Sequence, residues 1–167
     1  MRNGSLERIL KKLNKLCKEL DNYYDINKGG CCYVAYLIAT NLWNLNIKYK
    51  LVVCDKYKNC KALKMRKDIN SLELSNYGFN HYFIEVDGFP INMGYFYEDL
   101  FYHSKASYVN PFCIGKIYTY FKEKGGWNST YETSYNSIVK DTINKFFEEN
   151  EKRIRQIVDA RRRAQRR

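Results

Sequence analysis

The amino-acid sequence predicts an α+β protein in which helices pack on a small antiparallel sheet. Three observations lead to this fold class. Apolar residues recur at three- and four-residue steps from Leu6 to Leu20 and again after Ser134, which indicates amphipathic helices. Residues from Ile47 to Cys54 follow the two-residue period of a half-buried strand. Asp87-Gly88 lies between two strand-like segments and predicts a hairpin turn.

In chain order, the first expected element is the helix from Leu6 to Leu20, in which Glu and Lys separate the apolar residues. Turn-forming residues fill positions 22–30, and a second helix is predicted from Cys31 to about Leu45. After the first strand, the lysine-rich region 55–80 is interpreted as a variable insertion with a short helix near 69–74.

The hairpin is expected to consist of strands 81–86 and 89–94. With Asp87-Gly88 as a two-residue turn, Phe83 faces Asn92, and His81 lies on the same face of the sheet. Residues 95–111 show no clear period.

Two further helices are predicted, over 114–124 and from about Ser134 onward. The predicted organisation is therefore one domain over residues 1–133, followed by a long amphipathic helix with a basic end over residues 134–167.

Gly29-Gly30-Cys31-Cys32 opens the second predicted helix, which is a favourable place for a reactive thiol. The unpaired N–H groups and the dipole at a helix N-terminus stabilise a thiolate and can hold an oxyanion. The two glycines would let a substrate carbonyl approach closely. By itself, however, a Cys-Cys pair at the start of a buried helix is more often part of the core than catalytic.

His81 and Asn92 supply the other parts of a candidate catalytic triad. The imidazole of His81 would accept the thiol proton, and the amide of Asn92 would fix the orientation of the ring. Glu85 shares this sheet face and is an alternative orienting group, and Asn27 is a candidate oxyanion donor. His103 is expected at the surface.

This order of a helix-borne Cys, a strand, a strand-borne His and an Asn after a turn resembles the papain-like and transglutaminase-like superfamily, in particular bacterial transglutaminase-like peptidase domains. The matching segments are Gly29-Gly30-Cys31 with Ala35, Leu45-Asn46-Ile47 and His81-Tyr82-Phe83. The resemblance implies a papain-like or transglutaminase-like core with a Cys-bearing helix packed on the sheet, and the predicted N-terminal helix and long C-terminal helix are added to this core. It also implies a cysteine peptidase (thiol protease), another amidase or an amine acyltransferase, acting on a protein or peptide without a metal or cofactor.

The resemblance covers about residues 25 to 95, and the sequence departs from the family pattern in two places. Asn92 stands where transglutaminase-like members usually have Asp, although papain-like members use Asn. Alignment on Gly30-Cys31-Cys32-Tyr33 would instead make Cys32 the nucleophile. Cys31 is favoured because it shares a helix stripe with Ala35 and Ile38, which is expected to face the sheet that carries His81.

The C-terminal end is strongly basic. The formal net charge is +11, and the last eighteen residues contribute +6, from eight cationic and two anionic side chains. This end is predicted to bind nucleic acid without sequence specificity, or another acidic partner or surface. The competing interpretation is a solvated helix end. The candidate binding residues are Arg161, Arg162, Arg163, Arg166 and Arg167.

The alternative function is accordingly that of a catalytically inactive structural or nucleic-acid-binding protein. The abundance of Asn, Lys and Tyr is typical of an AT-rich genome, such as that of a virus or mobile element.

Cysteine usage favours a cytoplasmic or otherwise intracellular protein, including one associated with a virion. Cys17 lies on an apolar helix face and Cys54 in a strand, so reduced thiols are expected rather than disulfides. No segment approaches the roughly 20 apolar residues of a membrane span, and no signal peptide is evident. Since no C-x-x-C pair occurs and no histidine is near Cys54 or Cys60 in the sequence, no zinc site is expected.

Overall fold

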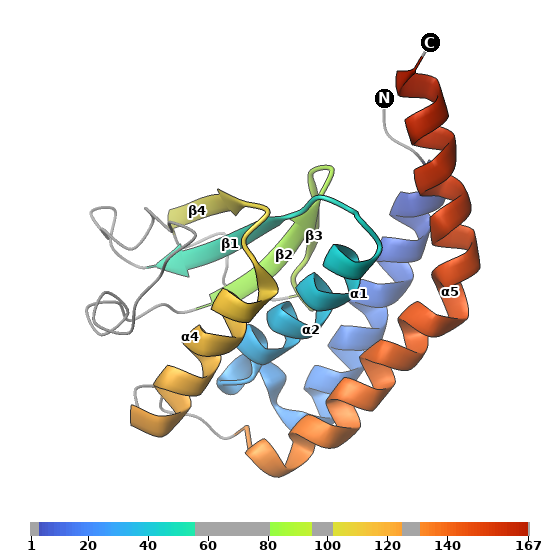
Figure 1. The fold of residues 1–167 in the computed structure, drawn as a ribbon. Coiled ribbons are helices and arrows are strands. Elements are labelled where there is room, and N and C mark those ends of the chain that lie inside the picture. The colour runs from blue at the N-terminus through green and yellow to red at the C-terminus, as the bar shows by residue number, and fades with distance from the viewer. Residues whose placement is uncertain (1–3, 56–80, 95–101, 125–130, 167) are drawn as a thin grey trace.

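The computed structural model describes residues 4–55, 81–94, 102–124 and 131–166 (Figure 1). Its N-terminal half contains helix α1 (Gly4–Tyr24), the short 3-10 helix η1 (Ile26–Lys28), helix α2 (Cys31–Asn44) and strand β1 (Lys50–Asp55). Strands β2 (His81–Val86), β3 (Phe89–Ile91) and β4 (Tyr102–Ser107) follow, and then helix α4 (Pro111–Lys124), the 3-10 helix η4 (Thr133–Tyr135) and helix α5 (Asn136–Gln165). The predicted α+β class is therefore confirmed.

The four strands form an antiparallel sheet in the order β3-β2-β1-β4. Val86 pairs with Phe89, so Asp87 and Gly88 alone make the turn. Their φ angles of 51° and 81° are the left-handed values that such a two-residue turn requires, which Asp and Gly tolerate. The predicted turn and its register are confirmed.

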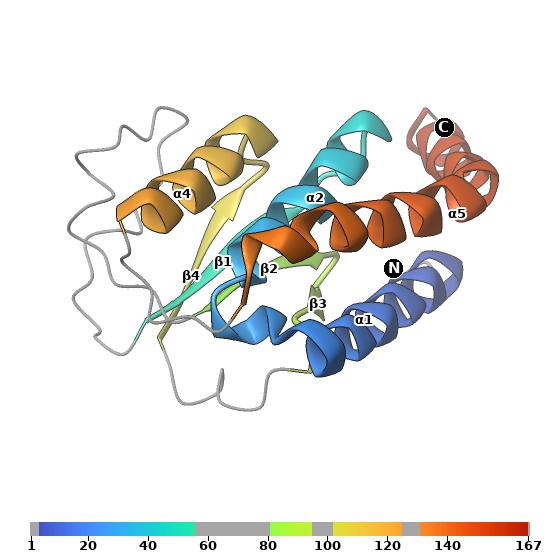
Figure 2. The same ribbon diagram turned by 90° about the horizontal axis from the view of Figure 1, so that it is seen from below.

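The helices gather on one side of the sheet, where α2 packs directly on β2 (Figures 1 and 2). Alternate strand residues, including Leu51, Val53, Tyr82 and Ile84, enter the main core with α2. The other sheet face has a separate small cluster of Val52, Cys54 and Phe83. The sheet thus separates the main core on its helix side from this small cluster on its other face.

Helix α5 lies along α1 and α2, and its apolar stripe belongs to the same core as theirs (Figure 2). The buried residues of this stripe are Val139, Ile143, Phe147, Ile154 and Ile157. The predicted long C-terminal helix is present, beginning at Asn136. Within the described ranges, no helix combines the length and the apolar character needed to cross a membrane.

Several boundaries differ from expectation, and strand β3 ends at Ile91 rather than at residue 94 because Met93 and Gly94 have positive φ angles that leave the extended conformation. Helix α1 continues to Tyr24, and β1 begins only at Lys50. Helix α4 begins early, at Pro111, because Pro suits a first helical position and the side-chain oxygen of Asn110 accepts the Phe112 N–H at 3.0 Å. Strand β4 was not predicted, since its residues are mostly polar. The short helix expected at 69–74 lies outside the described residues.

Candidate functional site

The two adjacent cysteines at the start of α2 face different parts of the molecule. The sulfur of Cys31 lies near the backbone N–H groups of Tyr82 and Cys32 as well as its own, all of which lower the pKa of the thiol. The thiol of Cys32 instead points toward α4, where it donates to the carbonyl oxygen of Ile114 at 3.7 Å. Cys31 therefore faces the strand that carries His81, and Cys32 does not.

The structure brings Cys31, His81 and Asn92 to the same end of β2. Since His81 directly precedes Tyr82, the Cys31 sulfur lies against the peptide bond between these two residues. The His81 imidazole is fully buried and interacts with the backbone of Asn92. The side-chain oxygen of Asn92 accepts the Gly94 N–H at 2.9 Å. In this arrangement the Asn92 backbone, rather than its amide, contributes to orienting the ring.

The thiol of Cys31 and the imidazole of His81 lie on opposite faces of the sheet at the end of β2. Tyr82, which Cys31 contacts, points into the main core. His81 has the opposite orientation, and its ring centroid lies 5.5 Å from that of Phe83. A thiol–imidazole hydrogen bond therefore requires the His81 ring to turn around the strand end, where it is the first residue of β2.

Burial keeps both groups neutral in the described conformation. Desolvation raises the pKa of the Cys31 thiol to about 11, although the Tyr82 N–H and the two N–H groups of the α2 terminus oppose this rise. Desolvation lowers the pKa of the His81 imidazole to about 3, against the opposing effect of the Asn92 backbone. Cys17, for which burial is the one cause of the shift, has a pKa of about 12. The N–H groups thus make Cys31 more acidic than a thiol that is only buried.

Tyr131 covers the N-terminus of α2. A Cβ atom at Gly30 would lie 2.8 Å from the Tyr131 ring, so this close approach requires glycine. The ring is buried, and its hydroxyl donates to the side-chain oxygen of Asn136 at 2.5 Å. The space that Gly30 was expected to leave for a substrate carbonyl is thus occupied by a side chain of the protein itself.

Two secondary candidates make other interactions. The backbone N–H and side-chain amide of Asn27 donate to the carboxylate of Asp21, at 2.6 and 3.1 Å. Glu85 forms an ion pair of 3.0 Å with Lys105. In the described conformation, Asn27 therefore does not direct a donor at an oxyanion, and Glu85 does not orient His81.

Although no histidine is near Cys54 in the sequence, two histidines lie beside it in the sheet. Cys54 pairs with His81 on β2 and with His103 on β4, so both histidines are its neighbours in the sheet. His103 is exposed, as expected. Over the described parts of the chain, no group of three His, Cys, Asp or Glu side chains has an arrangement that could hold a metal ion. The cysteines at 17, 31, 32, 54 and 113 are free thiols.

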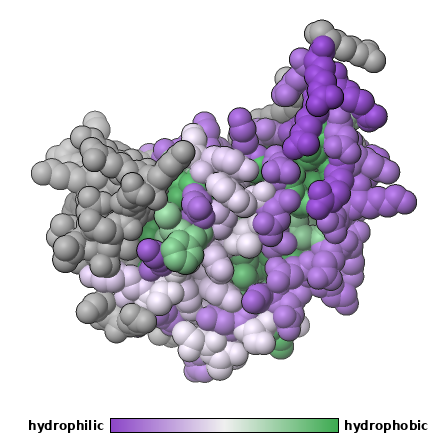
Figure 3. Space-filling model, in the orientation of Figure 1, coloured by the Kyte–Doolittle hydropathy of each residue, from purple (hydrophilic) through white to green (hydrophobic). Residues whose placement is uncertain are grey.

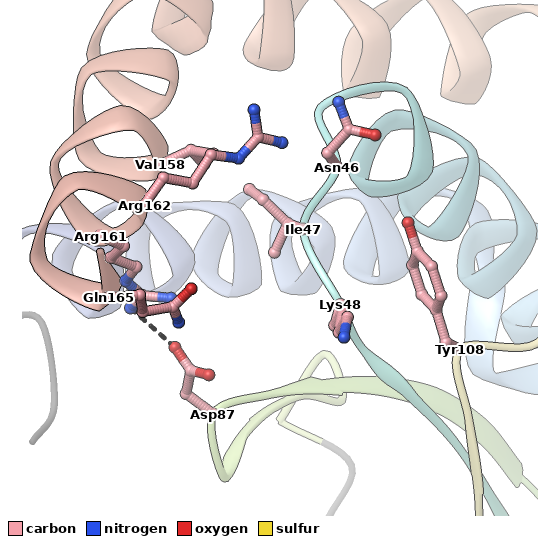
Figure 4. A pocket seen from close by; sticks show the side chains of 9 residues that line it. All are labelled: Asn46, Ile47, Lys48, Asp87, Tyr108, Val158, Arg161, Arg162 and Gln165. Carbon is pink, nitrogen blue, oxygen red and sulfur yellow. Dashed lines mark hydrogen bonds and ion pairs between the residues drawn. The ribbon is translucent and has the colours of Figure 1, made fainter. Parts of the chain in front are cut away.

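The predicted basic residues of α5 differ in their ion pairing and in their position relative to a surface cavity. Arg161 forms an ion pair of 2.8 Å with Asp87 at the hairpin turn, and Arg162 lines a surface cavity beside it (Figure 4). Arg163 and Arg166 are exposed, and Arg167 lies outside the described residues. Three lysines at the same cavity or its neighbour were missed, because they are far from α5 in the sequence: Lys48, Lys50 and Lys105.

Comparisons with protein-family models, with curated proteins and with solved structures found no match for this chain. The membership of the papain-like and transglutaminase-like superfamily stays a prediction. Function has to be inferred from the chemistry of the two regions just described.

Proposed function

We propose that the protein carries out thiol-dependent acyl chemistry on an amide or peptide substrate, with Cys31 as the nucleophile. The observation that carries this proposal is that the backbone N–H groups of Tyr82, Cys32 and Cys31 lower the pKa of the Cys31 thiol, at the strand end where His81 begins β2. N–H groups near a sulfur stabilise its thiolate form, and the imidazole of His81 would accept the proton once its ring has turned around the strand end. A cysteine that only fills space in the core needs neither N–H groups at its sulfur nor an imidazole as a proton acceptor.

In the proposed reaction, His81 removes the proton from Cys31, and the sulfur attacks the carbonyl carbon of the substrate. The N–H groups of the α2 terminus stabilise the oxygen of the tetrahedral intermediate. His81 returns the proton to the leaving amine, which departs as the carbon–nitrogen bond breaks and leaves a thioester on Cys31. Water then completes a peptidase or amidase reaction, whereas an amine acceptor completes an acyl transfer.

The described conformation is a closed state of this site. The Cys31 residue is 6% exposed, and the pKa shifts of Cys31 and His81 both favour their neutral forms. Entry of water or substrate would reduce the desolvation that causes both shifts and would therefore bring the two pKa values closer together. Movement of the Tyr131 ring away from Gly30 would provide such an opening.

The test is the rate of iodoacetamide labelling of each cysteine as a function of pH, followed by peptide mass spectrometry. Cys31 is expected to react faster than Cys17, which is a matched buried thiol on α1. Substitution His81→Gln is expected to slow Cys31 and leave Cys17 unchanged. Labelling of Cys31 at the rate of Cys17, with no response to His81→Gln, would contradict the proposal.

A further inference from the structure

A groove runs between the C-terminal end of α5, the β2–β3 turn and the segments 46–50 and 105–108. It consists of two neighbouring cavities of about 470 and 430 Å³. Both are lined by Lys48, Asp87 and Tyr108, so they adjoin each other. Figure 4 shows the side chains of Arg161, Arg162 and Gln165 on the α5 side of the first cavity. We name this feature the basic groove.

The charge of the basic groove is strongly positive. Both of its carboxylates are paired, Glu85 with Lys105 at 3.0 Å and Asp87 with Arg161 at 2.8 Å. Its other three cations are exposed and form no ion pair with any described residue; they are Lys48, Lys50 and Arg162. Five cations against two carboxylates leave a net charge of +3. Hydrophilic side chains also cover the projecting end of α5 (Figure 3). Anionic ligands are therefore attracted to this groove.

Left-handed backbone is concentrated at the same place. Five described residues other than glycine have a positive φ, and three of them line the groove: Asn46 at 59°, Asp87 at 51° and Tyr108 at 50°. Asn and Asp tolerate this conformation, but for a bulky residue such as Tyr it is unusual. Strained backbone tends to persist where function requires a particular geometry. At Tyr108 it places an aromatic ring in the wall of the groove.

Tyr108 belongs to an aromatic stack. Its ring lies 4.6 Å from that of Trp43, at an interplanar angle of 26°. Trp43 is in the last turn of α2 and is 37% exposed, which is unusual for so large an apolar ring. The stack therefore provides an apolar, planar surface at the edge of a cationic groove.

We propose that the basic groove binds single-stranded nucleic acid. Lys48, Lys50 and Arg162 would neutralise phosphates, and bases would stack on the surface formed by Trp43 and Tyr108. A single strand fits better than a duplex, because the bases of a duplex are already stacked on one another and cannot present their faces. Positive charge alone would attract single-stranded and duplex nucleic acid alike, so the preference for a single strand rests on the aromatic stack.

This site is independent of the thiol site, because the two lie at opposite ends of α2. A helix of 14 residues spans about 20 Å at ~1.5 Å per residue. Binding to the groove does not require Cys31 or His81, and it would persist if the acyl chemistry were absent.

Fluorescence anisotropy with a labelled single-stranded oligonucleotide tests the proposal, with a hairpin duplex of the same number of phosphates for comparison. The single strand is expected to bind more tightly. Combined substitution of Lys48, Lys50 and Arg162 by Gln should reduce the steepness of log K against log salt by about 2, at ~0.7 per phosphate contact. Trp43→Leu should weaken single-strand binding about tenfold and leave duplex binding unchanged.

The control for charge is a triple substitution by Gln of three exposed lysines outside the groove, Lys12, Lys140 and Lys152. In a Trp127→Phe background, Trp43 is the one remaining tryptophan, so quenching of its emission would report stacking directly. Equal losses in the two triple variants would overturn the proposal. Equal binding of duplex and single strand without quenching of Trp43, or binding only to anionic lipid vesicles, would overturn it as well.

Discussion

The two ends of helix α2 carry the two candidate sites, and their physical environments are opposite. At the N-terminal end, Cys31 is buried, and backbone N–H groups are its main polar neighbours. At the C-terminal end, Trp43 is partly exposed beside a groove with a net charge of +3. One rigid helix thus separates a closed, neutral region from an open, cationic one.

The comparison teaches that the two regions depend on solvent in different ways. At the thiol end, chemistry depends on how far burial moves the pKa values of Cys31 and His81. At the groove, the cations are exposed and already charged, so binding depends on salt concentration instead. A change at one end should leave the other unaffected, and the following predictions each alter one of the two ends.

The largest expected effect is on acylation of Cys31. Reaction with p-nitrophenyl acetate should form an acetyl-enzyme that Cys31→Ser abolishes and Cys32→Ser retains. Loss of a general base typically costs 10²–10⁴ in rate, so His81→Gln should slow acylation about 100-fold. Stopped-flow release of nitrophenolate measures the rate, and circular dichroism checks that the variants are folded. Unchanged oligonucleotide binding by all three variants would support the separation of the two ends.

The next effect is on stability at the thiol end. Gly30→Ala would place a Cβ atom 2.8 Å from the Tyr131 ring, and overpacking of this kind costs about 1–3 kcal/mol. Urea unfolding should show this loss. In a Tyr131→Ala background, the same substitution should cost much less, because the clash is removed. An equal cost in both backgrounds would show that the Tyr131 contact does not constrain Gly30.

An effect that develops gradually over several pH units is expected from the lowered pKa of His81. The unfolded imidazole, with an ordinary pKa of 6.5, gains a proton on acidification before the folded one, whose pKa is about 3. The contribution of the buried, neutral His81 to the free energy of unfolding is therefore complete above pH 6.5. It is lost between pH 6.5 and about 3, at up to about 1.4 kcal/mol per pH unit. Urea unfolding at several pH values should show a gentler acid slope in His81→Gln. An identical slope in the variant would exclude His81 as the cause.

The smallest effect is predicted for the groove. Asp87→Asn removes the ion pair with Arg161, which is partly exposed, and should change the free energy of unfolding by less than about 1 kcal/mol. Asn also tolerates the left-handed backbone at this position. Since the substitution removes a carboxylate and releases Arg161, it should tighten oligonucleotide binding, measured by anisotropy. Weaker binding would mean that the ion pair shapes the groove for its ligand.

The parts of the fold that depend on neighbouring residues could be predicted from the sequence. The Asp87-Gly88 turn fixed the register of β2 and β3, and the apolar steps of α1 and α5 identified their buried faces. Strand β4 could not be predicted, because a polar edge strand takes its conformation from pairing with β1 rather than from its own pattern.

The same limit applies to the candidate sites. The sequence placed Cys31 at a helix N-terminus, but it could not reveal that the Tyr82 N–H would reach the sulfur. It also gave no sign that Lys48 and Lys105 would join Arg162 in one groove, because these residues come from separate segments. Chemistry that depends on one local motif was visible, and chemistry assembled from distant segments was not.

The packing of α5 along α1 has a consequence for synthesis of the chain (Figure 2). The apolar face of α1 emerges from the ribosome before α5, which begins at Asn136 and helps to cover it. Until α5 has been made, part of the apolar face of α1 lacks its cover. Exposed apolar surface of this kind favours aggregation of nascent chains and binding by chaperones. Helix α1 therefore completes its packing only after α5 has been synthesised.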